Sequence, residues 1–191
     1  QYCKEGLTRS IQFCRQYKIP FQQCGKLLVA TNELELSRME QLFARCQKNQ
    51  INSELLNQSQ LNKREPNISG LGAIWVKDTG ITHYTLMTQT LLKLFEQLGG
   101  QVKFDFPIEH LEESSTGIHL SNQHSQLDTE FLINCAGIYA DELALKLGLS
   151  FDFKLMPFRG EYFRLTEKHN KVVNHLIYPI PDPELPFLGV H

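Results

Sequence analysis

The chain has 191 residues, of which 41% are hydrophobic and 21% are charged, and its net charge is −2. These values are typical of a globular protein that forms one ordinary domain or two small lobes. No block of like charge appears, which argues against nucleic-acid binding. No apolar run approaches the roughly 18 residues that a membrane span requires, although this leaves a peripheral membrane contact open.

The cysteines are odd in number and form no CxxC pair; they are Cys3, Cys14, Cys24, Cys46 and Cys135. No histidine stands at metal-ligand spacing, so no metal site is expected. Free thiols favour a reducing compartment, and we therefore expect a cytoplasmic protein. The chain starts within a predicted helix and stops directly after an apolar run, so we expect a fragment of a longer protein.

The first half of the chain predicts alternating helices and strands. Apolar residues at helical spacing indicate a helix over residues 3–17. Residues 25–31 (GKLLVAT) have the composition of a buried strand, and a helix over residues 33–48 follows, which Thr31 or Asn32 can cap. For residues 49–69 we expect a short helix and then a loop.

A strand over residues 72–80 and a strong amphipathic helix over residues 83–100 come next. Two glycines, Gly99 and Gly100, supply the C-terminal stop of this helix. Its predicted buried face consists of Leu86, Leu91, Leu92, Leu94, Phe95 and Leu98.

The second half predicts short strands separated by turn residues. We expect strands over residues 101–106, 108–114, 117–122 and 126–134, a brief helix over 140–147, and further strands over 155–165, 175–181 and 185–191. The fold class is therefore mixed α/β with two lobes.

No familiar catalytic or nucleotide-binding motif is present. The G-x-G at Gly70–Gly72 precedes a strand, which indicates an ordinary loop. From residue 85 to 147 the predicted order is a helix, a strand, a three-stranded meander and a buried strand that ends in Asn-Cys-Ala-Gly. This order is typical of the second half of a dinucleotide-binding sheet. An unrelated α+β packing stays open at this point.

Four stretches carry a resemblance to a known family: residues 99–111 (GGQVKFDFPIEHL), 132–148 (LINCAGIYADELALKLG), 157–165 (PFRGEYFRL) and 178–191 (YPIPDPELPFLGVH). The chain resembles the FAD-dependent oxidoreductases of the D-amino-acid-oxidase superfamily, and within it the group that oxidises L-2-hydroxyglutarate. The resemblance implies a two-lobed flavoenzyme with FAD as its cofactor, a dinucleotide-binding half-domain and a mixed-sheet substrate domain.

The resemblance also implies a division of the chain. Residues 1–83 would belong to the substrate lobe, residues 84–150 to the second half of the FAD-binding domain, and residues 151–191 to strands of the substrate domain. The family's G-x-G-x-x-G segment would precede this chain, and we expect the fragment to be inactive and to bind FAD weakly at best.

Four positions match the family's cofactor contacts. Ile108 falls where a strand backbone pairs with the adenine edge, and Cys135, Ala136 and Gly137 match the turn beside the cofactor. The alternatives are a plain core isoleucine at Ile108 and small packing residues in the turn. Cys135 is expected to be a small filler, since no neighbour in sequence would make it reactive.

Three positions resemble substrate-side residues of related flavin oxidases. His191 would be the base that takes the hydroxyl proton, Tyr178 an active-site anchor, and Arg159 the group that grips a substrate carboxylate. The alternatives are a strand-end histidine without a role, a core aromatic, and an ion pair of Arg159 with Glu161. His83 departs from the superfamily, which often has an acidic residue before this helix.

The implied reaction is oxidation of a 2-hydroxy acid, L-2-hydroxyglutarate, to the 2-oxo acid with hydride transfer to flavin, and oxygen or a quinone as the electron acceptor. A peripheral contact of this cytoplasmic protein with the inner membrane stays open. Another dehydrogenase of the superfamily, acting on glycerol 3-phosphate or an amino acid, and a non-catalytic α/β binding module are the alternatives.

Overall fold

The structure, a computed structural model, describes residues 2–184. Its elements fall into two units by their internal contacts. Unit 1 consists of Gln1–Phe95 and Arg164–His191, and unit 2 of Glu96–Phe163. The predicted strand over 185–191 lies outside the described residues, and the predicted domain boundaries stay a prediction.

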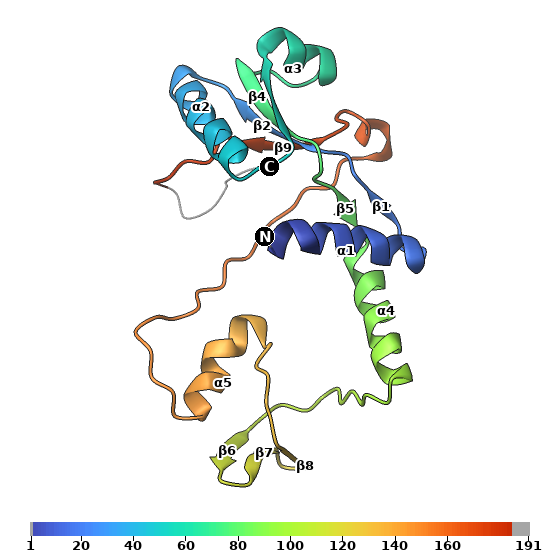
Figure 1. The fold of residues 1–191 in the computed structure, drawn as a ribbon, viewed down its shortest axis with the longest axis vertical. Coiled ribbons are helices and arrows are strands. Elements are labelled where there is room, and N and C mark those ends of the chain that lie inside the picture. Colours follow the sequence, from blue (N-terminus) through green and yellow to red (C-terminus); the bar gives the residue numbers. More distant parts are fainter. Residues whose placement is uncertain (1, 185–191) are drawn as a thin grey trace. The chain divides into compact units, whose positions relative to one another are not determined.

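A four-stranded sheet forms the centre of unit 1, in the order β3-β4-β2-β9 (Figure 1). Its strands are β2 (Lys26–Ala30), β3 (Ser53–Asn57), β4 (Gly72–Val76) and β9 (Leu176–Pro179). The first three pair antiparallel, whereas β9 runs parallel to β2. Four of the five residues of β2 are buried because this apolar strand has a neighbour on each side and a helix over each face.

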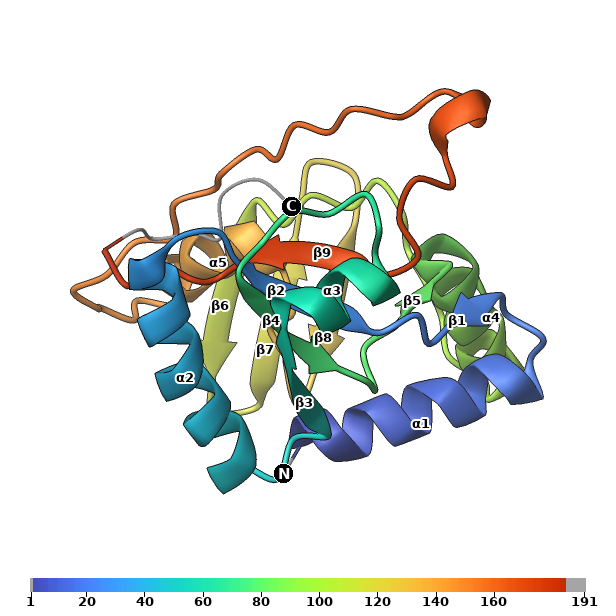
Figure 2. The same ribbon diagram turned by 90° about the horizontal axis from the view of Figure 1, so that it is seen from above.

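The two faces of the sheet are covered by different helices, α2 (Glu33–Lys48) and α3 (Gln58–Arg64). Successive side chains of a strand point to opposite faces. Leu28 of β2 accordingly packs with Met39 of α2, whereas Leu27 packs with Leu61 of α3. Figure 2 shows the sheet with its two helices from a second direction.

Side chains that accept backbone N–H groups fix the starts of both helices. Asn32 accepts from Glu35 at 2.9 Å, as predicted. Asn57 and Gln60 form a reciprocal capping box at α3. The expectation of a helix and loop over residues 49–69 was incomplete, because β3 precedes α3. Leu56 of β3 is 2% exposed, and pairing with β4 stabilises the strand.

The remaining elements of unit 1 are α1 (Tyr2–Gln16), β1 (Phe21–Gln22), β5 (Ile81–Thr82), most of α4 (Tyr84–Gln97) and the 3₁₀ turn η2 (Glu167–His169). β1 and β5 form a small antiparallel sheet. The helix α4 was predicted correctly, but its predicted buried face is wrong: none of its residues is buried, and Leu98 is 88% exposed. An amphipathic stripe is buried only against a second apolar layer, and the described residues give α4 none.

His83 caps α4. Its Nδ1 accepts the backbone N–H of Leu86 at 3.2 Å. We expect His83→Ala to lower the free energy of unfolding by about 0.5–2 kcal/mol, because one N-terminal N–H loses its acceptor. His83→Asp should preserve the stability, since a carboxylate can accept the same bond and is favoured at a helix N-terminus. Urea unfolding of both variants measures the effect, and equal stability of His83→Ala and the parent would contradict the capping role.

The strands of unit 2 form an antiparallel meander, β6 (His110–Ser114), β7 (Gly117–Ser121) and β8 (Gln126–Thr129). A 3₁₀ turn, η1 (Gly137–Tyr139), and the helix α5 (Ala140–Lys146) follow. The mixed α/β class and the meander are confirmed.

Three predicted strand segments are wrong, those over residues 101–106, 131–134 and 155–165, which form no strand. A strand needs a partner for its backbone N–H and C=O groups, and no described strand pairs with these segments. The expected burial of the segment before Asn134 fails for the same reason, and Phe131 and Ile133 are 82% and 84% exposed.

An ion pair ties the segment after β9 to α2. Arg38 Nη1 lies 3.0 Å from Asp182 Oδ2, and the backbone N–H of Glu184 donates to Asp182 Oδ1 at 3.0 Å. The Glu184 N–H, and after it the Arg38 guanidinium, lower the pKa of the Asp182 carboxyl below its usual value. The segment 180–184 is therefore anchored to unit 1 by polar contacts as well as by the buried Ile180.

The Asp182 contacts should contribute stability that depends on pH. A lowered pKa in the folded state gives stability that is present above the unfolded pKa of about 3.9 and is lost as pH falls through the folded pKa. We expect Asp182→Asn to be less stable than the parent at pH 7 and the difference to shrink below about pH 4. Denaturant midpoints measured from pH 7 to pH 2 test this, with Asp152→Asn as an exposed control. Parallel profiles for the parent and Asp182→Asn would show that the contacts contribute nothing.

Candidate functional site

The predicted cofactor turn lies in unit 2, immediately before α5. Asn134 shapes it: Nδ2 donates to the carbonyl of Ala140 at 2.8 Å, and Oδ1 accepts the N–H of Ala136 at 3.1 Å. Gly137 has φ +58, a left-handed conformation that favours glycine, and a side chain built there would meet only open space. Cys135 is exposed. The turn is therefore accessible and free of large side chains.

Ile108 lies in the same unit, two residues before β6, and is half-buried. Lys146, at the end of α5, donates to the carbonyl of Glu109 at 2.9 Å. This bond joins the backbone next to Ile108 to α5, the helix that follows the turn.

Tyr178 lies on β9 in unit 1, opposite Leu28 of β2. Its side chain packs on the α2 face against a buried cluster that contains Leu28 and Ile74. The ammonium group of Lys26 lies 5.2 Å from the centre of its ring, within cation–π range. The predicted anchor is thus half-buried in the wall of a core.

Arg159 is exposed in a part of unit 2 that has no regular structure. The alternative of an ion pair with Glu161 rested on a shared strand, and among the described residues no such pair forms. His191 lies outside the described residues. Of the predicted catalytic residues that the structure describes, Tyr178 therefore lies in unit 1 and Arg159 in unit 2, and their roles stay a prediction.

Sequence reasoning missed a buried polar network in unit 1. Glu65, which ends α3, is fully buried, and its carboxylate accepts from the segment before β9. The donors are the backbone N–H groups of Asn174 and His175, each at 2.8 Å, the Asn174 side chain at 3.4 Å, and His175 Nδ1 at 2.5 Å. In the contact between His175 Nδ1 and Glu65 Oε1, the imidazole tautomer decides which atom donates.

The single tryptophan of the chain, Trp75, lies beside this network. Its ring is edge-on to His175, with 6.1 Å between ring centres, and the guanidinium carbon of Arg64 lies 3.6 Å from its ring centre. Gly25 has φ +73, and a side chain there would come within 2.6 Å of the indole Nε1. Trp75 is therefore packed against α3, β2 and the segment before β9 at once.

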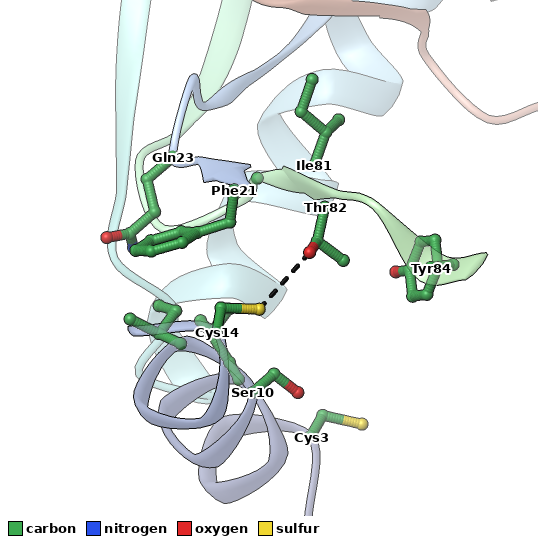
Figure 3. A pocket seen from close by; sticks show the side chains of 11 residues that line it. Cys3, Ser10, Cys14, Phe21, Gln23, Ile81, Thr82 and Tyr84 are labelled. Atoms are coloured by element: carbon green, nitrogen blue, oxygen red, sulfur yellow. Dashed lines mark hydrogen bonds between the residues drawn. The ribbon is translucent and has the colours of Figure 1, made fainter. Parts of the chain in front are cut away.

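A cavity of about 240 Å³ lies between α1 and the small sheet of β1 and β5 (Figure 3). Cys14 points from α1 towards Thr82, and Cys14 Sγ lies 3.4 Å from Thr82 Oγ1. Cys14 is 2% exposed, so it serves as a packing residue of this wall. All five cysteines are free thiols.

Residues 2–184 contain neither a metal-binding cluster nor a membrane-spanning helix. No group of three or more histidine, cysteine, aspartate or glutamate residues there is arranged to hold a metal ion. No helix in that range combines the length and the apolar composition needed to cross a membrane.

Comparison with known proteins identifies the family. The profile of the FAD dependent oxidoreductase (DAO) family matches residues 1–191, the whole chain. The chain belongs to this family. FAD, predicted from the resemblance, is therefore confirmed as the family's cofactor, and the exposed small-residue turn before α5 fits a large ligand there.

Relatives and solved structures agree with the family assignment. L-2-hydroxyglutarate dehydrogenase of Escherichia coli O17:K52:H18 is 46% identical over 192 residues, covering 100% of this chain and 46% of that protein. The chain thus spans about half the length of the curated relatives it matches. L-proline dehydrogenase from P. horikoshii matches 92% of this chain and 48% of that chain with TM-score 0.76 at 12% identity. FAD-bound L-alpha-glycerophosphate oxidase from Mycoplasma pneumoniae matches 85% of this chain and 44% of that chain with TM-score 0.71 at 20% identity. At these identities the structures show a shared fold.

Proposed function

We propose that the chain forms part of a flavoenzyme that oxidises L-2-hydroxyglutarate to 2-oxoglutarate. The observation that carries the proposal is the 46% identity with a bacterial L-2-hydroxyglutarate dehydrogenase along the whole chain. The chain also carries the exposed Asn-Cys-Ala-Gly turn in unit 2.

The cofactor would be held by residues of unit 2. The turn of Cys135, Ala136 and Gly137 would lie against it, because the side chains of these three residues are small. The backbone next to Ile108 would contact its adenine end. Bound FAD supplies a two-electron acceptor for the hydride that leaves carbon 2 of the substrate.

The substrate would be handled by three residues of this chain. His191 would take the hydroxyl proton, because imidazole titrates near neutral pH. Arg159 would pair with a carboxylate through two parallel hydrogen bonds, and its exposure leaves these donors accessible. Tyr178 would serve as an anchor from β9. Oxygen or a quinone would accept the electrons, in a cytoplasmic enzyme that touches the inner membrane peripherally where the acceptor is a quinone.

The proposal is tested in the full-length protein by mixing it anaerobically with L-2-hydroxyglutarate and following the loss of oxidised-flavin absorbance. We expect rapid bleaching with this substrate and little with glycerol 3-phosphate or amino acids. His191→Ala should slow bleaching by about 10²-fold or more, the typical contribution of a general base, whereas exchange of the exposed Lys48 for alanine should not. Bleaching by glycerol 3-phosphate instead would assign a different dehydrogenase.

The chain of 191 residues, in contrast, should have no oxidase activity and at best weak FAD affinity, since the family's pyrophosphate-binding glycine motif does not occur in it. Absorbance near 450 nm of the purified chain measures this directly. Stoichiometric yellow flavin would contradict this expectation while leaving the substrate assignment intact.

A further inference from the structure

A pocket of about 530 Å³ opens on the α3 side of the sheet in unit 1. Its polar wall comes from β3, α3 and the segment before β9, and consists of Glu54, Gln60, Lys63, Arg64, Asn174 and His175. Tyr178 faces the opposite, α2 side of the sheet. We propose that this pocket binds a small carboxylate anion.

The charges of the wall favour an anion. Lys63 and Arg64 contribute two positive charges, and within residues 2–184 neither forms an ion pair. The carboxylate of Glu54 is neutralised by Lys77, with 3.0 Å between Oε2 and Nζ. The second nearby carboxylate, Glu65, is fully buried behind the wall, and within residues 2–184 its partners are Asn174 and His175.

Arg64 is held in a geometry that suits a planar ligand. Its guanidinium lies over Trp75, with the central carbon 3.6 Å from the ring centre. The indole therefore covers one face of the guanidinium, and the N–H groups along its edge are left for a ligand. Its side chain forms no hydrogen bond within the described part of the chain. A guanidinium edge meets a carboxylate with two parallel hydrogen bonds, which makes a carboxylate the matching ligand.

The position of the cations on α3 favours a single negative charge. Lys63 and Arg64 stand in the last turn of the helix, where the partial negative charge of the helix C-terminus offsets part of theirs. A carboxylate fits the remaining positive charge better than a phosphate dianion does. Phosphate sites usually add backbone N–H donors of a helix N-terminus, which α3 does not direct to this pocket.

The part of the wall formed by Asn174 and His175 is held in place before any ligand binds. Glu65 binds the backbone N–H groups of Asn174 and His175 and the ring of His175, whose side chain is only 13% exposed. These bonds join parts of the chain that are 109 and 110 residues apart. A wall that is already ordered loses little entropy when a ligand binds, which favours affinity for a small anion.

Trp75 makes the proposal directly measurable, because it is the only tryptophan and it contacts both Arg64 and His175. The 191-residue chain is titrated with glutarate, acetate and inorganic phosphate, and its tryptophan fluorescence is recorded. We expect a saturable change with the two carboxylates. Lys63→Ala and Arg64→Lys should each raise the carboxylate concentration at the midpoint about tenfold, because each removes one charge-assisted hydrogen bond. Lys48→Ala should leave the midpoint unchanged.

Three results would overturn the proposal: no saturable change with either carboxylate, equal midpoints for Lys63→Ala and the parent, or saturation by phosphate alone. Lys63 is exposed and does not stack on Trp75, so its variant retains the fold and the fluorescence of the parent. The titration needs neither flavin nor turnover, and its outcome is therefore independent of the proposed oxidation of L-2-hydroxyglutarate.

Discussion

Replacement of Glu65 by alanine is expected to lower the free energy of unfolding by about 3–5 kcal/mol, the usual effect of removing one partner from a buried polar pair. The side chain is fully buried, and its loss would leave the N–H groups of Asn174 and His175 and the His175 ring without their acceptor. Since whole domains are stable by only about 5–15 kcal/mol, a large share of the chains would then be unfolded near physiological temperature.

One further variant separates the effect of the carboxylate charge from the effect of side-chain volume, and a second serves as an exposed control. Glu65→Gln keeps the size but places an NH₂ group among donors, so we expect an intermediate loss. Glu5→Gln removes an exposed carboxylate that pairs with Arg9 on α1, and should change stability by less than about 0.5 kcal/mol. Chemical denaturation with guanidinium measures all three, and a Glu65→Ala effect as small as that of Glu5→Gln would show that the network is not stabilising.

The second large effect is expected at Gly25. A methyl group there would stand 2.6 Å from Trp75 Nε1, and the backbone has φ +73, where side chains are strained. The steric conflict costs about 1–3 kcal/mol and the left-handed conformation about 1–2 kcal/mol. Gly25→Ala should therefore destabilise the chain by about 2–5 kcal/mol.

Gly6 provides the matched control for the Gly25 variant. It lies within α1, and a side chain there would meet nothing within 4 Å. Gly6→Ala should stabilise the chain by about 0.5–1 kcal/mol, because alanine is the better helix former. Thermal unfolding followed by circular dichroism should thus shift in opposite directions for the two variants, and equal shifts would refute the steric argument. The fluorescence of Trp75 should change only in Gly25→Ala.

The helices could be predicted because their signals are local. Apolar spacing and caps placed α2 at the predicted residues, with Asn32 at its start, and placed both ends of α1 within one residue. The start of α4 was predicted within one residue, but its end was predicted three residues too late. The burial of α4 could not be predicted in the same way, since a stripe such as Leu91 and Phe95 states only which side is apolar. Whether a second layer covers that side depends on the rest of the molecule.

Strands were predicted less well because they depend on partners. Residues 131–134 have an apolar strand composition but pair with no described strand. The less apolar β3 forms a strand because its residues from Ser53 to Asn57 pair with β4.

The candidate site shows the same limit. The turn at Gly137 could be located from its small residues and the family resemblance. The contact of Glu65 with His175 gave no local signal, because it joins residues 110 positions apart. The Asn-His pair before β9 and a glutamate at the end of α3 are unremarkable in isolation. Likewise, the side of the sheet on which Tyr178 lies became evident only from the pairing of β9 with β2.

The parallel pairing of β9 with β2 has a consequence for how the chain folds during synthesis. Lys26 stands opposite Leu176, so the ribosome must make about 150 more residues before the apolar strand β2 acquires its second neighbour. Until then, that edge can pair with another nascent chain or bind a chaperone. Closing so long a loop also slows folding. The late arrival of β9, and of the Asn174–His175 segment that Glu65 captures, should therefore be the step that commits unit 1 to its native state.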